Sequence, residues 1–397
     1  MGQGGHITII NNTDSTMKKT LCKSNQMEAW SFPEEIPAWQ RARVYVEWCD
    51  GVFTNTSHDR GTVVYTLSDG SGKSLSLTMA NAITRSMTVE LTGMAGPGII
   101  TSCPVQWRHD GEMYLVMDDR MDLKCWMGKV PGDTPVNKMD IPGTHDSLCF
   151  SITGFAGAFA PSAAKAQKMN IWDQLSYGSR YLDIRIDENL NGCHGVADCE
   201  NGLRDTMEVI RRFLEANRTE VIFMRIVNER SVSDKEAFRK RMDDIISSYG
   251  HLFCKRECLD KWPTLDEVRG RIIFLDDLKD HYLYEKGFGL VYDMENRFDI
   301  QDDYDKPDEN TKLNKIKENI DKPYAESVMK LNHVSAVGTA AGLFGLGWSP
   351  EDYANYLNPR VIDFTVNKSV DCVMGIVAFD FFDAMVSSPV VINNCRA

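Results

Sequence analysis

The chain has 397 residues, of which 43% are hydrophobic and 25% are charged, and its formal net charge is −13. This length exceeds what one hydrophobic core usually organises, so we expect a globular protein of two domains. The acidic balance argues against non-specific nucleic-acid binding, and no apolar run approaches the roughly 20 residues of a membrane-spanning helix.

Residues 1–6 read Met-Gly-Gln-Gly-Gly-His and lack the basic and apolar stretches of a secretory signal. We therefore expect a cytoplasmic location, with secretion as the alternative. The 11 cysteines are an odd number, which excludes complete pairing within the chain but does not decide between a reducing and an oxidising compartment.

The first part of the chain, residues 1–128, has the pattern of β-structure. The turn sequence Asp69-Gly70-Ser71-Gly72 lies between two alternating segments and predicts a hairpin. Several strands with glycine-rich turns and no long helix predict a β-sandwich-like accessory domain. The expected strands are 6–10, 43–48, 62–67, 75–79 and 87–91.

The pattern changes at the cluster Pro131-Gly132-Asp133-Thr134-Pro135, so we expect a second domain over 129–397. Strand-like and helix-like segments alternate beyond this cluster. Repeated β-then-α units predict an α/β domain, an irregular (β/α)8 barrel of the TIM type, whose functional residues lie at the carboxyl ends of strands. The expected strands are 180–186, 221–227, 271–275, 290–292, 330–333 and 375–379, and the clearest expected helices are 203–217 and 234–249.

Three polar clusters lie where such a barrel would place a site. His145 and Asp146 follow the first strand of the second domain, Arg185 lies in the next, and His194 ends a short third strand. These groups suit phosphodiester cleavage by an internal nucleophile. One imidazole accepts a proton from the attacking hydroxyl, the other donates one to the leaving oxygen, and the guanidinium binds the phosphate. Any one of these residues alone is more often structural.

Together, however, the motifs of the second domain resemble the bacterial-type, metal-independent phosphatidylinositol-specific phospholipase C family, the X-domain family. The matching strings occur in the family's order over nearly the whole domain, whereas the first domain resembles no family that we recognise. The strings are Ile141-Pro-Gly-Thr-His145-Asp146-Ser147, the run 174–185, His194-Gly195, 263–270, Gln301-Asp302-Asp303-Tyr304, 331–335 and 375–381.

The resemblance implies an enzyme that cuts the glycerol–phosphate bond of inositol phospholipids. His145 would be the general base for the inositol 2-hydroxyl, with Asp380 as the carboxylate that orients it. His194 would be the general acid, with Asp146 as its partner. Arg185 would bind the phosphate. Attack by the substrate's own hydroxyl implies diacylglycerol and inositol 1,2-cyclic phosphate as products, followed by slow hydrolysis to inositol 1-phosphate.

The resemblance also implies that Arg269, Asp302 and Tyr304 hold the inositol ring of phosphatidylinositol or of an inositol glycolipid. One position departs from the family, because Val227 stands where bacterial members carry a lysine. A missing hydrogen bond to the headgroup would weaken the selectivity for it.

No metal and no other cofactor is expected. In the calcium-dependent animal enzymes, acidic residues gather around the phosphate and an asparagine follows the first catalytic histidine. Here Asp146 follows that histidine and Arg185 supplies the positive charge in place of Ca²⁺. Cys193 and Cys199 bracket His194 and could be bridged in an oxidising compartment.

Two alternatives are left open. A glycerophosphodiesterase or sphingomyelinase D-type barrel also uses two histidines, but it binds Mg²⁺ through a Glu-x-Asp pair that Asp183-Ile184-Arg185 lacks. The other alternative is a membrane-binding protein led by its β-domain, with an inactive barrel.

Two apolar segments suggest how an acidic protein reaches a lipid. Both follow strands of the second domain and would emerge beside the site, where aromatic and aliphatic side chains suit a membrane interface. We expect peripheral membrane contact through a rim around the site, although packing as a local lid is the alternative. The rim residues are Phe155, Phe159, Leu343, Phe344, Leu346 and Trp348.

Overall fold

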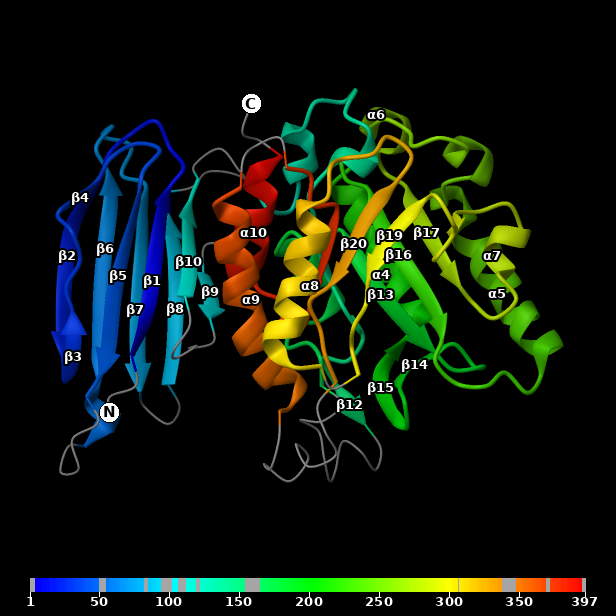
Figure 1. Ribbon diagram of the computed structural model, residues 1–397, viewed down its shortest axis with the longest axis horizontal. Helices are drawn as coiled ribbons and strands as arrows, with labels where there is room; N and C mark the ends of the chain where they lie inside the picture. The colour runs from blue at the N-terminus through cyan, green and yellow to red at the C-terminus, as the bar shows by residue number, and fades with distance from the viewer. Residues whose placement is uncertain are drawn as a thin grey trace. The chain divides into compact units, whose positions relative to one another are not determined.

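The computed structural model describes residues 4–49, 55–81, 85–93, 102–105, 112–118, 122–153, 165–305, 307–337, 348–368 and 372–394. The chain divides into two compact units (Figure 1). The first contains Met1–Leu123 and Asp383–Pro389, and the second contains Lys124–Phe382 and Val390–Ala397. Within the described ranges, no helix is both long enough and apolar enough to cross a membrane.

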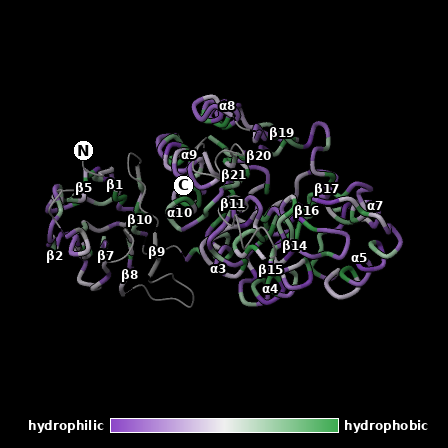
Figure 2. Tube along the Cα trace, turned by 90° about the horizontal axis from the view of Figure 1, so that it is seen from below, coloured by the Kyte–Doolittle hydropathy of each residue, from purple (hydrophilic) through white to green (hydrophobic). Residues whose placement is uncertain are grey.

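The first unit consists of two β-sheets, whose strands Figure 2 shows in two layers. One sheet has the order β10-β1-β5-β3 and the other has the order β4-β2-β6-β7-β8-β9. The ladder of β1 with β10 is parallel, and the remaining ladders are antiparallel. The strands are β1 (Gly4–Asn11), β2 (Met17–Asn25), β3 (Met27–Trp30), β4 (Glu35–Ile36), β5 (Arg41–Trp48), β6 (Arg60–Leu67), β7 (Ser74–Asn81), β8 (Arg85–Thr92), β9 (Ser102–Val105) and β10 (Glu112–Met117).

The five strands expected in this region are confirmed. The expected hairpin joins β6 and β7, where Val63 lies opposite Leu77 and Tyr65 lies opposite Leu75. These four side chains alternate with more exposed positions and are buried, as the period of two predicts. In the turn, Gly70 has a φ of 78°, a left-handed conformation that glycine adopts without steric cost.

The second unit is built on a sheet that contains a parallel run in the order β19-β20-β21-β11-β13-β16-β17-β18. β14 pairs antiparallel with β13 and continues into a hairpin with β15. The strands are β11 (Ile141–Thr144), β12 (Ile152–Thr153), β13 (Tyr181–Ile186), β14 (Asn191–His194), β15 (Ala197–Gly202), β16 (Ile222–Asn228), β17 (Ile272–Asp277), β18 (Leu290–Val291), β19 (Phe298–Gln301), β20 (Met329–His333) and β21 (Ile376–Phe379).

Parallel strands alternating with helices confirm a mixed α/β unit, and the six expected strands are all present. Among the described residues, no ladder joins β18 to β19 at the two ends of the parallel run. Strand pairing alone therefore leaves the sheet open and does not establish the expected barrel.

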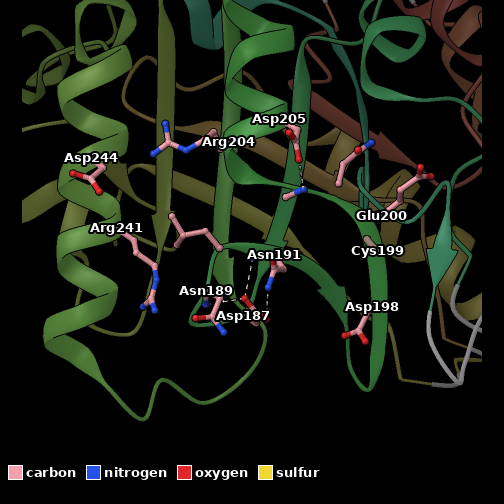
Figure 3. A pocket seen from close by; sticks show the side chains of 13 residues that line it. Asp187, Asn189, Asn191, Asp198, Cys199, Glu200, Arg204, Asp205, Arg241 and Asp244 are labelled. Carbon is pink, nitrogen blue, oxygen red and sulfur yellow. Dashed lines mark hydrogen bonds between the residues drawn. The ribbon is translucent and has the colours of Figure 1, made fainter.

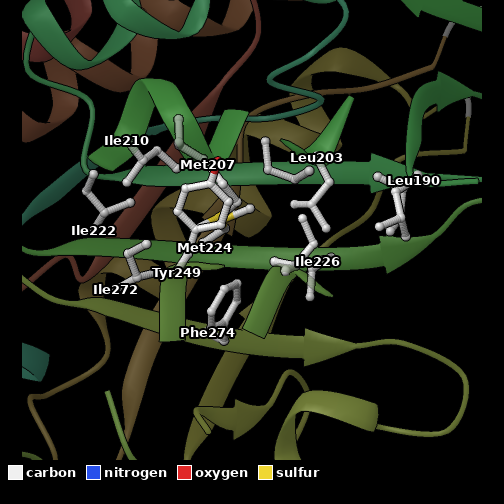
Figure 4. Packing of buried hydrophobic residues seen from close by; sticks show 14 of the residues in the cluster. Leu190, Leu203, Met207, Ile210, Ile222, Met224, Ile226, Tyr249, Ile272 and Phe274 are labelled. Atoms are coloured by element: carbon white, nitrogen blue, oxygen red, sulfur yellow. The ribbon is translucent and has the colours of Figure 1, made fainter. Parts of the chain in front are cut away.

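Both expected helices form, and each buries one apolar face. Helix α4 (Leu203–Ala216) packs Met207 and Ile210 against the sheet, where they meet Met224 and other outward-facing strand residues (Figure 4). The other helices are α3 (Ile171–Ser176), α5 (Lys235–Tyr249), α6 (Leu265–Val268), α7 (Tyr282–Glu285), α8 (Glu309–Asp321), α9 (Pro350–Val366) and α10 (Ala384–Asn393), and short 3-10 helices span Thr56–His58, Trp126–Lys129, Val136–Lys138, Gly250–Leu252 and Arg256–Leu259.

The other face of the same strands is polar. Side chains alternate along a strand, so the face opposite Ile184, Ile226 and Phe274 carries Asp183, Arg185 and Arg225. This placement directs charged groups to the side of the sheet that the outer helices do not cover.

Candidate active site

The first histidine lies in a sharp turn directly after β11. The backbone of Asp146 is left-handed, with a φ of 42°, and Phe381 after Asp380 has a φ of 50°. Non-glycine residues adopt this region at an energetic cost, which recurs at functional sites. The His145 amide donates to the Phe379 carbonyl at 3.1 Å, so the loops after β11 and β21 are held together.

A buried glutamine reinforces this link between the two loops. Gln167 Nε2 donates to the carbonyls of His145 at 2.7 Å and Phe379 at 2.8 Å, and its Oε1 accepts from the Phe382 amide at 3.1 Å. Three hydrogen bonds from one side chain therefore fix the turns that carry His145 and Asp380. Sequence reasoning missed Gln167, because its role depends on contacts more than 200 residues away along the chain.

His145 is buried and lies between carboxylates. Its Nδ1 is 2.8 Å from Asp380 Oδ1, and its Nε2 is 3.7 Å from Asp146 Oδ2. Burial alone would lower the pKa of this imidazole, but Asp146 and Asp380 outweigh burial and raise the pKa to about 9. Arg185 Nη2 lies 2.8 Å from Nε2. That contact is a hydrogen bond only in the neutral tautomer with its hydrogen on Nδ1, toward Asp380.

Arg185 on β13 extends into the centre of this cluster. Its guanidinium forms ion pairs with Asp146, with Asp183 at 3.2 Å and with Glu229 at 3.3 Å. Burial alone would lower the pKa of Arg185, but these carboxylates outweigh burial and raise it well above its ordinary value. Burial alone would raise the pKa of Asp183, but the charges of Arg185 and Arg225 outweigh burial and lower it. The guanidinium is therefore permanently charged, and 18% of the side chain is exposed for a ligand.

His194 ends β14 and faces the same carboxylate from the other side. Its Nε2 is 3.4 Å from Asp146 Oδ2, and 20% of its side chain is exposed. Glu229 Oε1 accepts from the Gly195 amide at 2.9 Å, while its other oxygen pairs with Arg185. Glu229 thus connects the hairpin of His194 to the arginine.

The remaining polar residues of the first motif stabilise the loop. Thr144 Oγ1 is 2.7 Å from Ser147 Oγ and donates to Gln174 Oε1 at 2.8 Å. The Ser147 amide donates to the Asp183 carbonyl at 2.9 Å, and the Asp183 amide donates to Ser147 Oγ at 2.9 Å. The loop after β11 is therefore joined to β13 by reciprocal hydrogen bonds.

The structure does not bring Arg269 to this cluster. The residue precedes β17, at the amino end of the strand, whereas His145 follows the carboxyl end of β11. Its guanidinium donates to the carbonyls of Thr219 at 2.7 Å and Met127 at 3.1 Å and pairs with Asp266 at 2.6 Å. The geometry therefore gives no support to the implied role of Arg269 in ring binding, because the residue lies at the opposite end of the parallel strands from His145.

Asp302 and Tyr304 lie after the carboxyl end of β19, at the expected edge of the sheet. Burial lowers the pKa of His333 to about 3, and the nearby charge of Asp302 opposes this effect. The ring centroid of His333 is 5.7 Å from that of His145. Asp302 also lines a cavity of about 390 Å³. Tyr304 is 54% exposed.

A cation that the sequence did not single out lies beside Val227. Val227 is opposite Arg185 on β13 and opposite Asp277 on β17. Arg225, two residues earlier and on the same face, reaches past this short side chain to Asp277 at 2.6 Å. Its guanidinium carbon is 3.9 Å from the centroid of the Tyr292 ring. The alternation of β16 was the signal that could have identified Arg225.

Among the residues that the structure describes, two groups of side chains have donor atoms close enough to hold a metal ion. One is His145, Asp146 and Asp183, and the other is Asp146, Cys149 and His194. Arg185 contacts the carboxylates of the first group at 3.2 Å or less. The guanidinium thus occupies the place that a divalent cation would take there and would repel it.

Most of the expected membrane rim lies outside the described residues, and this applies to Phe155, Phe159, Leu343, Phe344 and Leu346. Trp348 is described and is half-buried. Its ring centroid is 5.0 Å from that of Tyr353 and 5.5 Å from that of Tyr356, so it packs on α9.

Comparisons with known proteins point to one family of enzymes. The family model described as PI-PLC X 1 matches residues 138–337. A 1-phosphatidylinositol phosphodiesterase of Listeria monocytogenes is 31% identical over 280 residues, 68% of this chain and 85% of that protein. The solved phosphatidylinositol-specific phospholipase C from L. monocytogenes has a TM-score of 0.60 at 30% identity, over 69% of this chain and 99% of that chain. A Staphylococcus aureus phosphatidylinositol-specific phospholipase C, solved in work on the modulation of its membrane binding, shares the fold, with a TM-score of 0.57 at 20% identity over 70% and 98% of the two chains.

Proposed function

The chain belongs to the phosphatidylinositol-specific phospholipase C X-domain family, and we propose that it cleaves the glycerol–phosphate bond of inositol phospholipids. The attacking group is the 2-hydroxyl of the inositol ring. The products are diacylglycerol and inositol 1,2-cyclic phosphate, which water opens slowly to inositol 1-phosphate. The observation that carries the proposal is that His145 and His194 both face Asp146, beside the Arg185 guanidinium.

His145 acts as the general base in this reaction. Its neutral form keeps a hydrogen on Nδ1, toward Asp380, and accepts the hydroxyl proton on Nε2. Asp380 then stabilises the imidazolium that forms. When the substrate binds, the Arg185 guanidinium donates to the phosphate oxygens instead of to His145. The Nε2 atom of His145 is then open to the substrate hydroxyl.

His194 donates a proton to the diacylglycerol oxygen, and Asp146 stabilises its charged form before that step. Arg185 binds the phosphate oxygens and stabilises the charge that develops on them. Because this cation stands where a Ca²⁺ ion would otherwise act, the reaction needs no metal and no other cofactor.

Asp302 and Tyr304 hold the inositol ring, by hydrogen bonding and by packing of the aromatic ring on its apolar face. Asp277 contributes a further acceptor for ring hydroxyls, and Arg225 orients it. Arg225 thus supplies the positive charge that a lysine supplies at position 227 in bacterial members. The substrate headgroup is therefore phosphatidylinositol or an inositol glycolipid.

The catalytic domain comprises residues 129–397 and forms an irregular TIM-like barrel, while residues 1–128 are an accessory β-sandwich domain. The similarity of the second unit to the L. monocytogenes enzyme supports this division. The membrane surface is the peripheral partner, contacted through the rim that includes Trp348. The known membrane binding of the S. aureus protein supports this last proposal.

The histidine assignment is tested by release of diacylglycerol from phosphatidylinositol vesicles. His145→Ala and His194→Ala should each lower the rate by on the order of 1000-fold or more, because each removes one half of the acid–base pair. His251→Ala is the matched control, since this exposed histidine lies in the 3-10 helix Gly250–Leu252 and should keep wild-type activity. Substantial activity in either catalytic variant, with the fold intact by circular dichroism, contradicts the proposal.

A further inference from the structure

Two buried cysteines of the second unit are in contact. Cys149 Sγ and Cys199 Sγ are 3.5 Å apart, and the residues are 1% and 7% exposed. The ladder of β12 with β15 places Ile152 opposite Cys199, which brings the preceding turn with Cys149 beside the strand. A disulfide has an S–S distance of about 2.05 Å, so the two sulfur atoms need to approach by only about 1.5 Å.

The same hairpin directs apart Cys193 and Cys199, the pair whose bridging the sequence left open. Cys193 on β14 lies opposite Asp198 on β15. Neighbouring residues of a strand point to opposite faces, so Cys193 and Cys199 are directed away from each other. The partner of Cys199 is therefore 50 residues away along the chain, not the cysteine next to His194.

The position of the pair connects the two catalytic loops. Cys149 is in the turn that begins with His145 and Asp146, and its amide donates to the Asp146 carbonyl at 2.8 Å. Cys199 lies on β15, which pairs with the strand that ends at His194. A covalent bond between the sulfur atoms would join the segment of the general base to the segment of the general acid.

Cys199 is the more exposed residue of the pair, at 7% against 1% for Cys149. Cys199 lines a cavity of about 560 Å³ between the β14–β15 hairpin and helices α4 and α5, where Arg204 and Arg241 also contribute (Figure 3). The hydrogen bond to Cys199 and burial raise the pKa of Cys149 well above its ordinary value. Because Cys199 is the more exposed residue and lines the cavity, an external reagent reaches it first.

We propose that Cys149 and Cys199 form a disulfide that cross-links the loop of His145 to the hairpin of His194. The oxidant is a small disulfide such as oxidised glutathione. The Cys199 thiolate attacks one of its sulfur atoms and releases one thiol, and Cys149 then attacks Cys199 and releases the second. Both cysteine protons are lost, and the external disulfide is reduced to two thiols. This inference stands independently of the proposed lipid substrate.

The experiment incubates the full chain with oxidised glutathione, blocks free thiols by alkylation and maps the peptides without reduction. A linked peptide containing Cys149 and Cys199 is expected, together with a Tm raised by about 5 °C over the reduced protein. Cys193→Ser should retain both effects. Cys149→Ser should lose both, and Cys149→Ala serves as a second variant because a buried serine hydroxyl is itself destabilising.

Three outcomes would overturn the proposal. They are alkylation of both cysteines after full exposure to the oxidant, linkage of Cys199 to Cys193, and a mixed disulfide with glutathione on Cys199 as the final product. Because peptide mapping and Tm do not depend on activity, failure here is separate from failure of the proposed phospholipase function.

Discussion

At the scale of single residues, the behaviour of the site depends on the carboxylates around His145. Asp146 and Asp380 both lie within 3.7 Å of its ring nitrogens, and they raise its pKa from the ordinary 6.5 to about 9. A pKa of about 9 favours the protonated form in the free site at neutral pH, and this form gives up the Arg185 hydrogen bond at Nε2. The neutral form, which is the proposed base, gains population as the pH rises toward 9.

This charge balance predicts the pH dependence of the reaction. On a soluble short-chain phosphatidylinositol, kcat/KM of the cyclising step should rise with pH along a limb set by His145. Asp380→Asn removes a carboxylate that raises the pKa, so the limb should move to lower pH by about one unit or more. The maximal rate should fall on the order of 100-fold or more, because the imidazolium loses its partner.

The control for this profile is Asp244→Asn, which changes an exposed aspartate on α5 outside the catalytic cluster and should leave the profile unchanged. A limb that stays in place in Asp380→Asn, or that moves to higher pH, would show that Asp380 does not act through the charge of His145.

At the scale of elements, the two ends of the parallel strands have different roles. His145, Asp302 and Asp380 follow strands at their carboxyl ends, whereas Arg269 precedes β17 and binds carbonyls of neighbouring segments. In barrels of this type, contacts at the amino ends of the strands stabilise the sheet, and the proposed chemistry belongs to the residues at the carboxyl ends.

We therefore predict opposite effects for two substitutions. Arg269→Ala should reduce the free energy of unfolding by about 1–3 kcal/mol, because buried carbonyls lose their donor, and should leave KM for soluble substrate nearly unchanged. Asp302→Ala should raise KM about tenfold with little effect on unfolding. Urea denaturation and steady-state kinetics measure both. A large rise in KM for Arg269→Ala without loss of stability would restore its implied role in ring binding.

Sequence reasoning succeeded where the signal was local. The period of apolar residues located α4, and alternation located β6 and β7, because each pattern is read within one element. β2 was missed, since most of its side chains are exposed and show no apolar alternation. The contact of Cys149 with Cys199 was missed because strand order, not spacing, brings distant residues together.

At the scale of the whole molecule, His145, Asp146, Arg185, His194 and Asp380 all belong to the second unit. The order of the motifs along the chain, which matches that of the family, identified these residues as candidates. Only the structure showed that Asp146 lies beside both histidines. The net charge of −13 gives the chain no broad attraction to anionic lipid, so local apolar contact remains the expected route to a membrane.

In the proposed mechanism, two histidines and an arginine cleave the lipid by internal attack without a metal. The most direct test follows phosphatidylinositol cleavage by ³¹P NMR with EDTA in excess. The predicted result is an undiminished rate, with inositol 1,2-cyclic phosphate as the first product and inositol 1-phosphate appearing later. Loss of activity in EDTA that Ca²⁺ or Mg²⁺ restores, or a phosphomonoester formed with no cyclic precursor, would contradict the claim.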